Sequence, residues 1–459
     1  MKHLKTLLLL ISLCPIWAKA QSIEEIRRAM DAYDYEMPIA QIAPASGDTL
    51  FTPLRAKALR AMNRYPEALK EWNSLLQADS TNTKILIELA ECYKLVGRTS
   101  EATPCYEKAV ALHPENTYFR QQHVRALLAT ENYEQARNAC HAWLDKDSLS
   151  AMAFKLMGMA YEGMVDNPDA LTNAFMSYNA AYRIDSLDAQ TVAHIAAIFN
   201  NNEQFQDAVD VTEKYRLTDT LNIDVNRQNA KAYCFLKYYP MAIKRYESLK
   251  GMGDKSFTTL YYLGISHYAD NWMYGAYDNL LLAHKKSPMD VNVLYYLGKS
   301  AARTSWKKEG VGYIKEAIEI STPTDSLMSR LYDGLVECYR YVNAPYEKIE
   351  AMKKLYSYNK KYTLFYHIAY TYDRQKDYAN AVHYYEKYMA QVPKDKQLAL
   401  DDEGKPKPNV ETLYQIAKRR VEKIKAEDFF RNGVHDDYFE PKMLNALKAK
   451  KDSLNKIKK

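Results

Sequence analysis

The amino-acid sequence predicts an all-α solenoid of tandem antiparallel helix pairs, and three observations support this fold class. Small residues recur in one series at intervals of about 34 residues. A second series of small residues precedes the first by twelve positions in most intervals. Large aromatic residues follow both series at helical spacing. Two series that keep one period indicate a repeated structural unit, and a period of this length is typical of helical repeats.

The later series marks the second helix of each unit, which we term helix B. Its members are Ala68, Ala102, Ala136, Ala174, Ala208, Ala242, Ala276, Gly310 and Ala381, with Lys348 as a degenerate member. The earlier series marks the first helix, helix A, and contains Ala56, Ala90, Gly158, Ala196, Ala230, Gly264, Gly298 and Ala369, with Val124 and Val336 as weaker members. Only Gly or Ala lets two helix backbones approach closely, so we expect the two series to meet where helices A and B cross.

A large side chain follows the small residues on the same predicted helix face. Three residues after the first small position stand, for example, Tyr93, Phe199 and Tyr372, and four residues after the second stand Trp72, Tyr106 and Tyr385. These spacings keep the bulky and the small side chain on one side of a helix. The 39 tyrosines of the chain indicate either aromatic packing between helices or a surface built for contact.

Helix-ending residues separate the units. Proline follows helix B at Pro114, Pro288 and Pro393, where it stops the helix. Asp-Ser pairs at 79–80, 147–148 and 185–186 supply short polar residues that can cap the next helix. Two repeats are longer than 34 residues because of insertions at 163–170 and 321–326, where we expect surface bulges.

The pattern resembles the tetratricopeptide repeat, which has small residues at positions 8 and 20, aromatic residues at 11 and 24, and proline at 32. Residues 82–116 match it almost completely, through Leu89, Ala90, Tyr93, Ala102, Tyr106, Ala109 and Pro114. The resemblance implies a right-handed superhelical solenoid with ten repeats over residues 49–394. A divergent helix pair at 21–48 would precede the repeats, and a polar loop with a capping helix at 395–430 and a basic tail at 431–459 would follow.

Residues 1–20 have the features of a cleaved signal peptide. Lys2 and Lys5 precede an apolar stretch over residues 7–17, and residues 18–20 form a small-x-small cleavage pattern. The apolar stretch is close to half the roughly 20 residues that a membrane span needs. Leu13 stands where a lipoprotein signal has a small residue, so we expect cleavage after Ala20 rather than a lipid on Cys14. The sequence therefore predicts an exported protein, periplasmic or secreted.

Charge and cysteine usage exclude several classes of function. The formal net charge of +6 includes three leader lysines, and residues 442–459 hold seven Lys and one Asp. The rest of the chain has no basic stripe, so we expect no nucleic-acid partner. The five remaining cysteines are odd in number and lack a CxxC spacing, which favours buried thiols over a disulfide framework or a zinc site: Cys92, Cys105, Cys140, Cys234 and Cys338.

The sequence contains none of the HExxH, GxSxG, GxGxxG or Walker patterns that mark common catalytic and cofactor sites. Four histidines lie on predicted A helices, but none has a second metal ligand at helical spacing: His123, His194, His267 and His367. We therefore expect a protein that is not an enzyme and that uses no metal and no cofactor.

Two hypotheses about function stay open. The first is a protein–protein interaction scaffold in the cell envelope that holds a peptide or partner protein on its concave face. The second is a carbohydrate-capturing protein, because outer-membrane starch-binding lipoproteins also contain such repeats. The poor lipoprotein signal, and a repeat array without room for that family's large inserted loops, count against the second hypothesis. The oligomeric state is left open.

The basic C-terminal tail also has two interpretations. Apolar residues recur there at helical spacing, with lysines on the other faces: Met443, Leu444, Leu447, Leu454 and Ile457. Such a segment could make a weak contact with an anionic membrane surface. The favoured interpretation is a frayed, solubilising end.

In the resembling family, positions 5, 9 and 12 of helix A, together with positions 2 and 13, line the groove. From the sixth repeat onward such positions gather tyrosine and basic residues: Arg227, Lys231, Tyr261, Tyr268, Tyr295, Lys299, Arg303, Arg340, Tyr341, Tyr366, Tyr370 and Arg374. Tyrosine and arginine dominate binding hot spots, so we expect this groove to bind an extended or helical segment with acidic and apolar character. The alternative is that these tyrosines only pack between helices.

Overall fold

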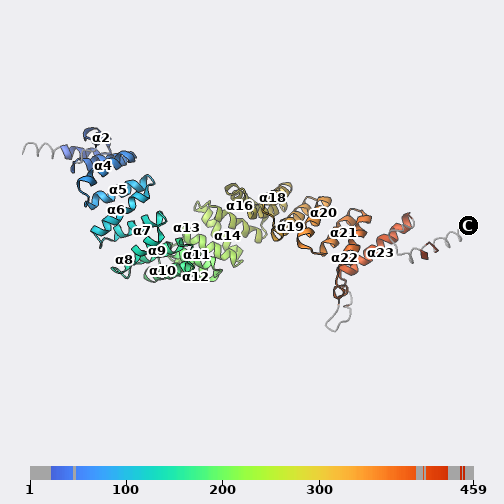
Figure 1. The fold of residues 1–459 in the computed structure, drawn as a ribbon. Helices are drawn as coiled ribbons and strands as arrows, with labels where there is room; N and C mark the ends of the chain where they lie inside the picture. Colours follow the sequence, from blue (N-terminus) through green and yellow to red (C-terminus); the bar gives the residue numbers. More distant parts are fainter. Residues whose placement is uncertain are drawn as a thin grey trace, which may run out of the picture. The chain divides into compact units, whose positions relative to one another are not determined.

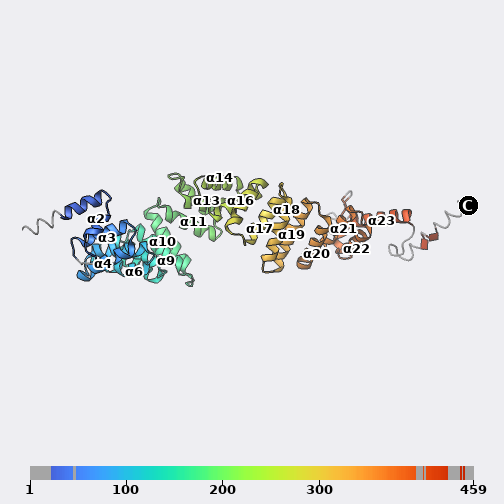
Figure 2. The same cartoon turned by 90° about the horizontal axis from the view of Figure 1, so that it is seen from above.

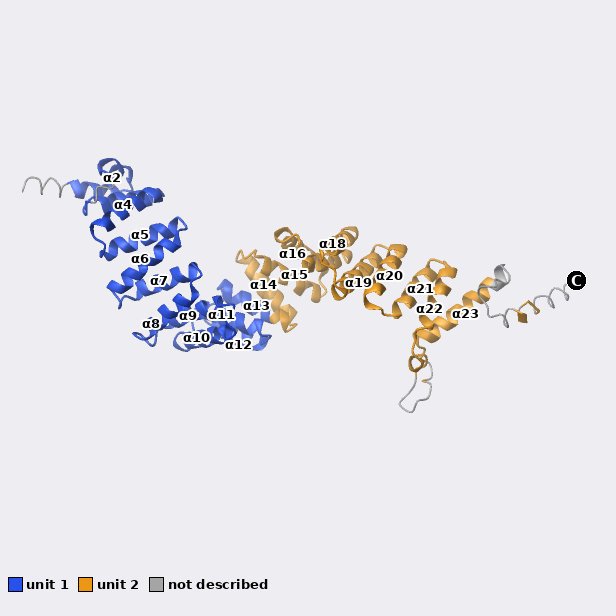
Figure 3. Cartoon of the chain, viewed as in Figure 1, with its two compact units in different colours: residues 1–232 blue, residues 233–459 orange. Residues whose placement is uncertain are grey.

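The structure is a computed structural model that describes residues 22–44, 48–399, 407, 410–432, 445–446 and 448–449. Every regular element within these ranges is a helix, which confirms the all-α fold class (Figure 1). The signal peptide, Cys14 and most of the basic tail lie outside the described residues. The chain divides into unit 1, residues 1–232, and unit 2, residues 233–459, which Figure 3 colours separately.

Unit 1 begins with a helix at residues 22–31 and the short α2 (Glu36–Gln41). Five helix pairs follow: α3 (Thr52–Ala61) with α4 (Tyr65–Ala78), α5 (Thr83–Leu95) with α6 (Thr99–Leu112), α7 (Thr117–Ala129) with α8 (Tyr133–Leu144), α9 (Ala151–Gly163) with α10 (Ala170–Ile184), and α11 (Ala189–Asn201) with α12 (Phe205–Arg216). The next helix, α13 (Ile223–Phe235), begins in unit 1 and ends in unit 2.

Unit 2 continues the alternation with α14 (Tyr239–Gly251). It then contains α15 (Phe257–Ala269) with α16 (Met273–Lys286), α17 (Val291–Ala302) with α18 (Lys307–Ile320), α19 (Asp325–Tyr341) with α20 (Pro345–Asn359), and α21 (Thr363–Arg374) with α22 (Tyr378–Met389). A 3-10 turn η1 (Lys394–Lys396) and α23 (Leu413–Asn432) complete the described helices. From α3 to α22, odd-numbered helices are A helices and even-numbered helices are B helices.

Most consecutive helices within a unit pack side by side, for example α3 with α4 and α17 with α18 (Figure 2). A helices of successive repeats touch as well: α7 contacts α9, α15 contacts α17, and α17 contacts α19. The A helices of neighbouring repeats therefore contribute to one shared surface within a unit.

The recurring small residues lie where helices A and B cross. Ala56, Ala68, Ala90 and Ala102 are completely buried in unit 1. In unit 2, a β-carbon placed on Gly310 of α18 would lie 2.6 Å from the carbonyl oxygen of Gly298 of α17. The two backbones touch at this point, which confirms the predicted reason for the small-residue series.

The longer connection before α19 differs from the bulge expected at residues 321–326. The chain is helical from Asp325 onward, so part of the insertion lengthens α19 to 17 residues. The Thr324 side chain accepts a hydrogen bond from the backbone nitrogen of Leu327, and the carboxylate of Asp325 lies in the first turn. Both features stabilise a helix start, which explains why the insertion became helical.

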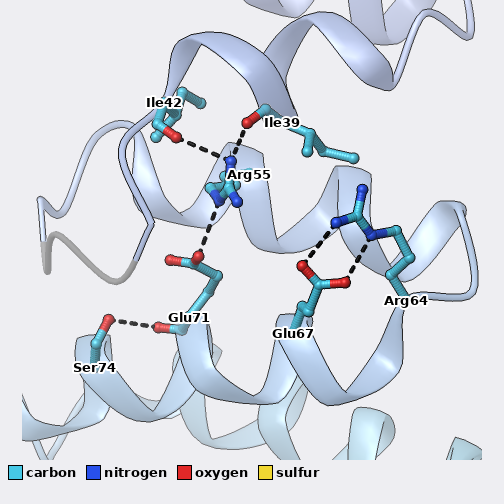
Figure 4. Close-up of polar contacts among 7 residues, drawn as sticks. All are labelled: Ile39, Ile42, Arg55, Arg64, Glu67, Glu71 and Ser74. Atoms are coloured by element: carbon cyan, nitrogen blue, oxygen red, sulfur yellow. Dashed lines mark hydrogen bonds and ion pairs between the residues drawn. The ribbon is translucent and has the colours of Figure 1, made fainter.

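Arg55 of α3 attaches α2 to the first repeat (Figure 4). Its guanidinium donates hydrogen bonds to the carbonyl oxygens of Ile39 and Ile42 and pairs with Glu71 of α4 at 2.9 Å. The side chains of Arg55 and Glu71 are both buried. Buried charges are stable only when they have hydrogen-bonded partners, so this network fixes the position of α2.

The final helix, α23, packs on α22. Arg420 of α23 donates two hydrogen bonds of 2.7 Å to the carboxylate of Asp373 on α21. The hydroxyl of Tyr385 on α22 donates to the same carboxylate at 3.5 Å. Helix α23 thus covers groups that the next repeat would cover in a longer array.

Candidate partner-binding surface

The twelve residues that the sequence assigns to the groove divide between the two units. Arg227 and Lys231 lie on α13 within unit 1. The other ten belong to unit 2, on α15, α17, α19 and α21, with Arg303 at the C-terminal cap of α17. We use the name unit 2 A-face for the side chains that these four helices and Arg303 contribute.

Arg227 and Lys231 have partners inside unit 1. Arg227 pairs with Asp224 at 2.8 Å, and the Lys231 ammonium donates to the side-chain oxygen of Asn201 at 3.2 Å. Burial lowers the pKa of Lys231. The Arg227 charge is therefore balanced within its own helix, whereas Lys231 is held by a neutral amide.

Lys299 of α17 is the centre of the unit 2 A-face. Its ammonium lies 2.9 Å from the Glu337 carboxylate of α19 and 3.4 Å from the Tyr295 hydroxyl. It also lies over the Tyr268 ring of α15, 5.6 Å from the ring centroid. Burial alone lowers the pKa of Lys299, but hydrogen bonds to Tyr268 and Glu337 outweigh burial and raise it. Lys299 therefore stays charged and connects three successive A helices, α15, α17 and α19, through its side-chain contacts.

The tyrosines around Lys299 pack on one another. Tyr295 and Tyr296 make an edge contact at 5.1 Å, and Tyr296 contacts Tyr268 at 5.3 Å. Tyr261 stacks on Phe257. Tyr295 is only 7% exposed. The groove position of Tyr295 therefore does not make it an open contact residue, because the neighbouring rings and Arg330 cover it.

Arginines of the unit 2 A-face have neutral partners. Arg330 donates to the side-chain oxygen of Asn292 at 2.5 Å, lies 4.5 Å from the Tyr295 ring centroid, and has a buried Nε without a hydrogen-bond partner. Arg303 donates to Asn271, and Arg340 donates to the Tyr341 hydroxyl at 3.1 Å. Arg374, at the end of α21, is exposed and has no ion pair within the described residues. No carboxylate of the described chain balances these four cations by direct contact.

Arg330 was missed in the sequence-based set, although a signal for it exists. It occupies position 2 of its repeat, one of the positions that the resemblance places in the groove. Tyr296, at position 6, carries no such signal, because its contact with Tyr268 depends on how α15 and α17 pack.

The two tyrosines of α21 differ in accessibility. Tyr366 contacts the rings of Tyr385 and Tyr388 on α22, which is packing between helices. Tyr370 is 49% exposed. Tyr370 is therefore the more accessible aromatic side chain for a partner on this helix.

The A helices of unit 1 have a different charge pattern. Glu88 pairs with Lys57 and Arg60, and Glu91 accepts a hydrogen bond from the Tyr106 hydroxyl at 2.5 Å. Glu162 accepts from Tyr178 at 2.8 Å and lies 3.0 Å from His194. On the A helices of unit 1, carboxylates thus lie among the cations. The four arginines of the unit 2 A-face have no such carboxylate in contact with them within the described residues.

Three further features of the described residues are relevant to the site. No group of three His, Cys, Asp or Glu side chains in the described residues could hold a metal ion. Cys92, Cys105, Cys140, Cys234 and Cys338 are free and buried, which confirms that they act as small core residues. Within the same described ranges, no helix is long and apolar enough to cross a membrane.

Tandem helix pairs with Gly or Ala at most crossings, and with a shared A-helix surface, define a solenoid of tetratricopeptide type. Comparison with protein-family models agrees with this class. The model "Psidin, N-terminal TPR repeats region" matches residues 48–143, and the model "Tetratricopeptide repeat" matches residues 362–390. Tetratricopeptide repeats are thus detected in both units.

One curated relative is described as a probable UDP-N-acetylglucosamine–peptide N-acetylglucosaminyltransferase SPINDLY of Hordeum vulgare. It is 24% identical over 171 residues, which cover 35% of this chain and 18% of the barley protein. The chain therefore matches less than a fifth of the length of that relative.

Solved structures of similar fold include the C-terminal part of a TPR repeat-containing protein from Cytophaga hutchinsonii, at 14% identity and a TM-score of 0.39, with 52% of this chain and 96% of that chain covered. The human IFIT1 dimer with PPP-AAAA has 14% identity and a TM-score of 0.37, with 77% and 92% covered. Yeast Tom70 has 12% identity and a TM-score of 0.32, with 91% and 97% covered. At such TM-scores these likenesses carry no inference about function.

Proposed function

We propose that this chain is a non-catalytic protein–protein interaction scaffold that binds an acidic and apolar segment of a partner protein on the unit 2 A-face. The observation that carries the proposal is the set of four arginines with neutral partners or none: Arg303, Arg330, Arg340 and Arg374. A guanidinium binds a carboxylate through two parallel hydrogen bonds, so each arginine can accept an Asp or Glu of the partner.

The apolar part of the segment would contact the aromatic side chains between these arginines. Tyr370 is exposed, and Tyr261 and Tyr268 are half-buried. Tyrosine buries a large area at low cost in side-chain entropy and still offers a hydroxyl, which suits it to a binding surface. The packing of Tyr295 and Lys299 would keep this surface rigid before the partner arrives.

Site-directed crosslinking in intact cells tests the proposal. A photoreactive amino acid in place of Tyr370 should capture a partner, and mass spectrometry of the product should place the crosslink in a segment rich in Asp or Glu. The same amino acid in place of Tyr118, an exposed tyrosine of α7 in unit 1, is the matched control. Capture from Tyr118 alone, or of a basic segment, would contradict the proposal.

The absence of catalysis belongs to the same proposal. Incubation of the captured partner with the purified chain should leave the mass of the partner unchanged. A covalent change that depends on this chain would show that it is an enzyme.

We also propose that the chain works outside the cytoplasm, because residues 1–20 have a charged start, an apolar stretch and a small-x-small cleavage pattern. N-terminal sequencing of the protein from its native cells should begin at Gln21. A chain that begins at Met1, or one with a lipid on Cys14, would contradict this part of the proposal.

A further inference from the structure

The turns between helices A and B have an unusual composition in the repeats of unit 2. Four successive turns, at residues 235–240, 269–274, 303–308 and 341–346, connect α13 to α14, α15 to α16, α17 to α18, and α19 to α20. Five aromatic side chains in them are between 43% and 59% exposed: Phe235, Tyr238, Trp272, Tyr274 and Tyr346. The charged residues of these turns are Lys237, Asp270, Arg303, Lys307 and Lys308. We call these four turns the aromatic–basic edge.

The turns of unit 1 show that the repeat does not require this composition. Four of the five equivalent turns, at 62–67, 96–101, 130–135 and 202–207, contain six carboxylates and two arginines. Each arginine pairs with a glutamate of its own turn, Arg64 with Glu67 and Arg98 with Glu101. The tyrosines and the phenylalanine of these turns are half-buried rather than exposed. The same backbone turn thus carries an acidic surface in unit 1 and an aromatic, basic surface in unit 2.

The exposed rings of the edge are held in place. A β-carbon on Gly275 would lie 2.4 Å from the indole of Trp272, so one side of this indole rests on the α16 backbone, while His267 contacts it edge-on at 4.4 Å. Tyr274 reaches the next turn, where it contacts the Trp306 ring at 6.0 Å and the Ser305 hydroxyl at 3.3 Å. Trp272 and Tyr274 are therefore fixed before contact, and these two side chains have little entropy left to lose.

The cations of the edge are available to an anionic surface. Among the described residues, Lys237, Lys307 and Lys308 take part in no ion pair, and Arg303 contacts the neutral side chain of Asn271. Indole and phenol rings partition to the boundary between lipid headgroups and acyl chains, because each has an apolar body and a polar tip. Lysine and arginine near such a boundary are attracted by the negative surface potential of anionic lipids.

We propose that the aromatic–basic edge of unit 2 rests on the surface of a bilayer that contains anionic lipids. The aromatic side chains enter the headgroup region, and the lysines contact lipid phosphates. The edge consists of turn tips rather than a groove, which suits a broad surface better than an enclosed peptide. Arg303 and Tyr341, at the ends of α17 and α19, belong to both the unit 2 A-face and the edge turns. The other residues of the unit 2 A-face lie on the A helices and not on these turns, so apart from these two the protein partner and the bilayer use different residues.

Vesicle binding by the full mature chain tests this proposal. Vesicles of phosphatidylcholine and phosphatidylglycerol in equal parts should bind the chain at least about tenfold more strongly than phosphatidylcholine alone, the equivalent of about 1.4 kcal/mol. Brominated lipids should quench tryptophan fluorescence, because Trp272 and Trp306 belong to the edge whereas Trp72 and Trp143 are buried.

The triple change Tyr238→Ser, Trp272→Ser and Tyr274→Ser should weaken vesicle binding by about tenfold or more, because three aromatic rings would no longer enter the headgroup region. The matched control replaces three exposed leucines in turns of unit 1, Leu149, Leu187 and Leu221, with Ser and should leave binding unchanged. Circular dichroism should show the same helix content for both variants.

Three outcomes would overturn the proposal. The chain could fail to bind either kind of vesicle, the edge variant could bind as tightly as the wild type, or binding could disappear only when the lysines of residues 442–459 are replaced. The last outcome would assign membrane contact to the tail. Binding of the edge to a soluble acidic polypeptide but not to vesicles would assign it to a protein partner instead.

Discussion

At the residue scale, the two arginines in Figure 4 have different environments and should contribute differently to stability. Arg55 is buried with Glu71 and also holds the end of α2, whereas Arg64 and Glu67 form a pair in which both side chains are well exposed. Removal of one partner from a buried pair leaves an uncompensated charge. An exposed pair is already well solvated without its partner.

We therefore expect Arg55→Met to lower the free energy of unfolding by about 3 to 5 kcal/mol. Arg64→Met should leave it nearly unchanged, because this exposed pair is already solvated. Urea denaturation followed by circular dichroism measures both. Limited proteolysis of Arg55→Met should also show earlier cleavage near residues 42–51, since α2 loses its attachment. Equal losses for the two variants would show that Arg55 is not buried as described.

The cysteines provide a second prediction at this scale. Burial raises the pKa of Cys92 to about 11 and that of Cys140 to about 12. At pH 8 both thiols remain protonated in the folded chain, so they should not react with Ellman's reagent until the protein unfolds. Rapid reaction of either thiol in the native state would contradict the described burial.

The same pKa shifts predict how stability depends on pH. An unfolded thiol loses its proton near pH 8.5, whereas the buried thiols keep theirs to a higher pH. Between these values the folded state binds more protons than the unfolded state, so the free energy of unfolding should fall as pH rises above about 8.5. Thermal melts from pH 7 to pH 10 check this direction.

Single residues also show where sequence reasoning stops. The small residues at most helix crossings could be predicted, because Gly and Ala allow the closest approach of two helix backbones whatever the details of the neighbouring repeat. The accessibility of Tyr295 could not, because it depends on Tyr296 and on Arg330, which reaches the Tyr295 ring from α19. A position in a repeat defines which way a residue points, but not what covers it.

At the scale of the element, Gly310 and Gly312 of α18 form a natural pair for comparison. A β-carbon on Gly310 would meet the backbone of α17, whereas a β-carbon on Gly312 would meet nothing within 4 Å. Gly310→Ala should therefore destabilise the protein by about 1 to 3 kcal/mol through overpacking. Gly312→Ala should stabilise it by about 0.5 to 1 kcal/mol, because Ala has the higher helix propensity.

Thermal unfolding of the two glycine variants measures these effects in the same helix. Opposite shifts in melting temperature are the expected result. A stabilising effect of both substitutions would mean that α17 and α18 do not approach as closely as described.

The helix pairs themselves were predictable, and the extension of α19 was not. Period and small residues define helices A and B, because each crossing imposes the same requirement. Residues 321–326 break the period, so the sequence pattern gave no register for them. Whether these residues are helical depends on the local helix start formed by Thr324 and Asp325 rather than on the repeat.

At the scale of the whole molecule, the two units differ in charge. Residues 21–232 contain 29 acidic and 21 basic side chains, whereas residues 233–459 contain 28 acidic and 39 basic ones. An acidic partner is attracted by the second set and repelled by the first, and complementary charge mainly increases the rate of association. The association rate with such a partner should therefore fall as salt concentration rises, which stopped-flow fluorescence can measure.

Part of the proposed binding surface could be predicted from the sequence, and part could not. The tyrosine and arginine positions followed from the repeat register, since A-helix positions recur in every repeat. In unit 1 the cations pair with carboxylates, whereas in unit 2 the arginines contact neutral groups. This contrast depends on contacts between repeats, such as Arg60 with Glu88 and Arg330 with Asn292. Such contacts join residues 28 and 38 positions apart, beyond what a single repeat reveals.

The most direct test of the central claim is the affinity of the crosslinked partner for charge-reversal variants of this chain. Arg340→Glu with Arg374→Glu should weaken binding by about 2 kcal/mol or more, because acidic side chains of the partner would then face carboxylates. Both arginines are exposed, so the melting temperature should not change. The matched control, Lys84→Glu with Arg125→Glu, reverses two exposed cations on A helices of unit 1 and should leave the affinity unchanged. Equal loss in both pairs, or loss only in the control, would show that the unit 2 A-face is not the binding surface.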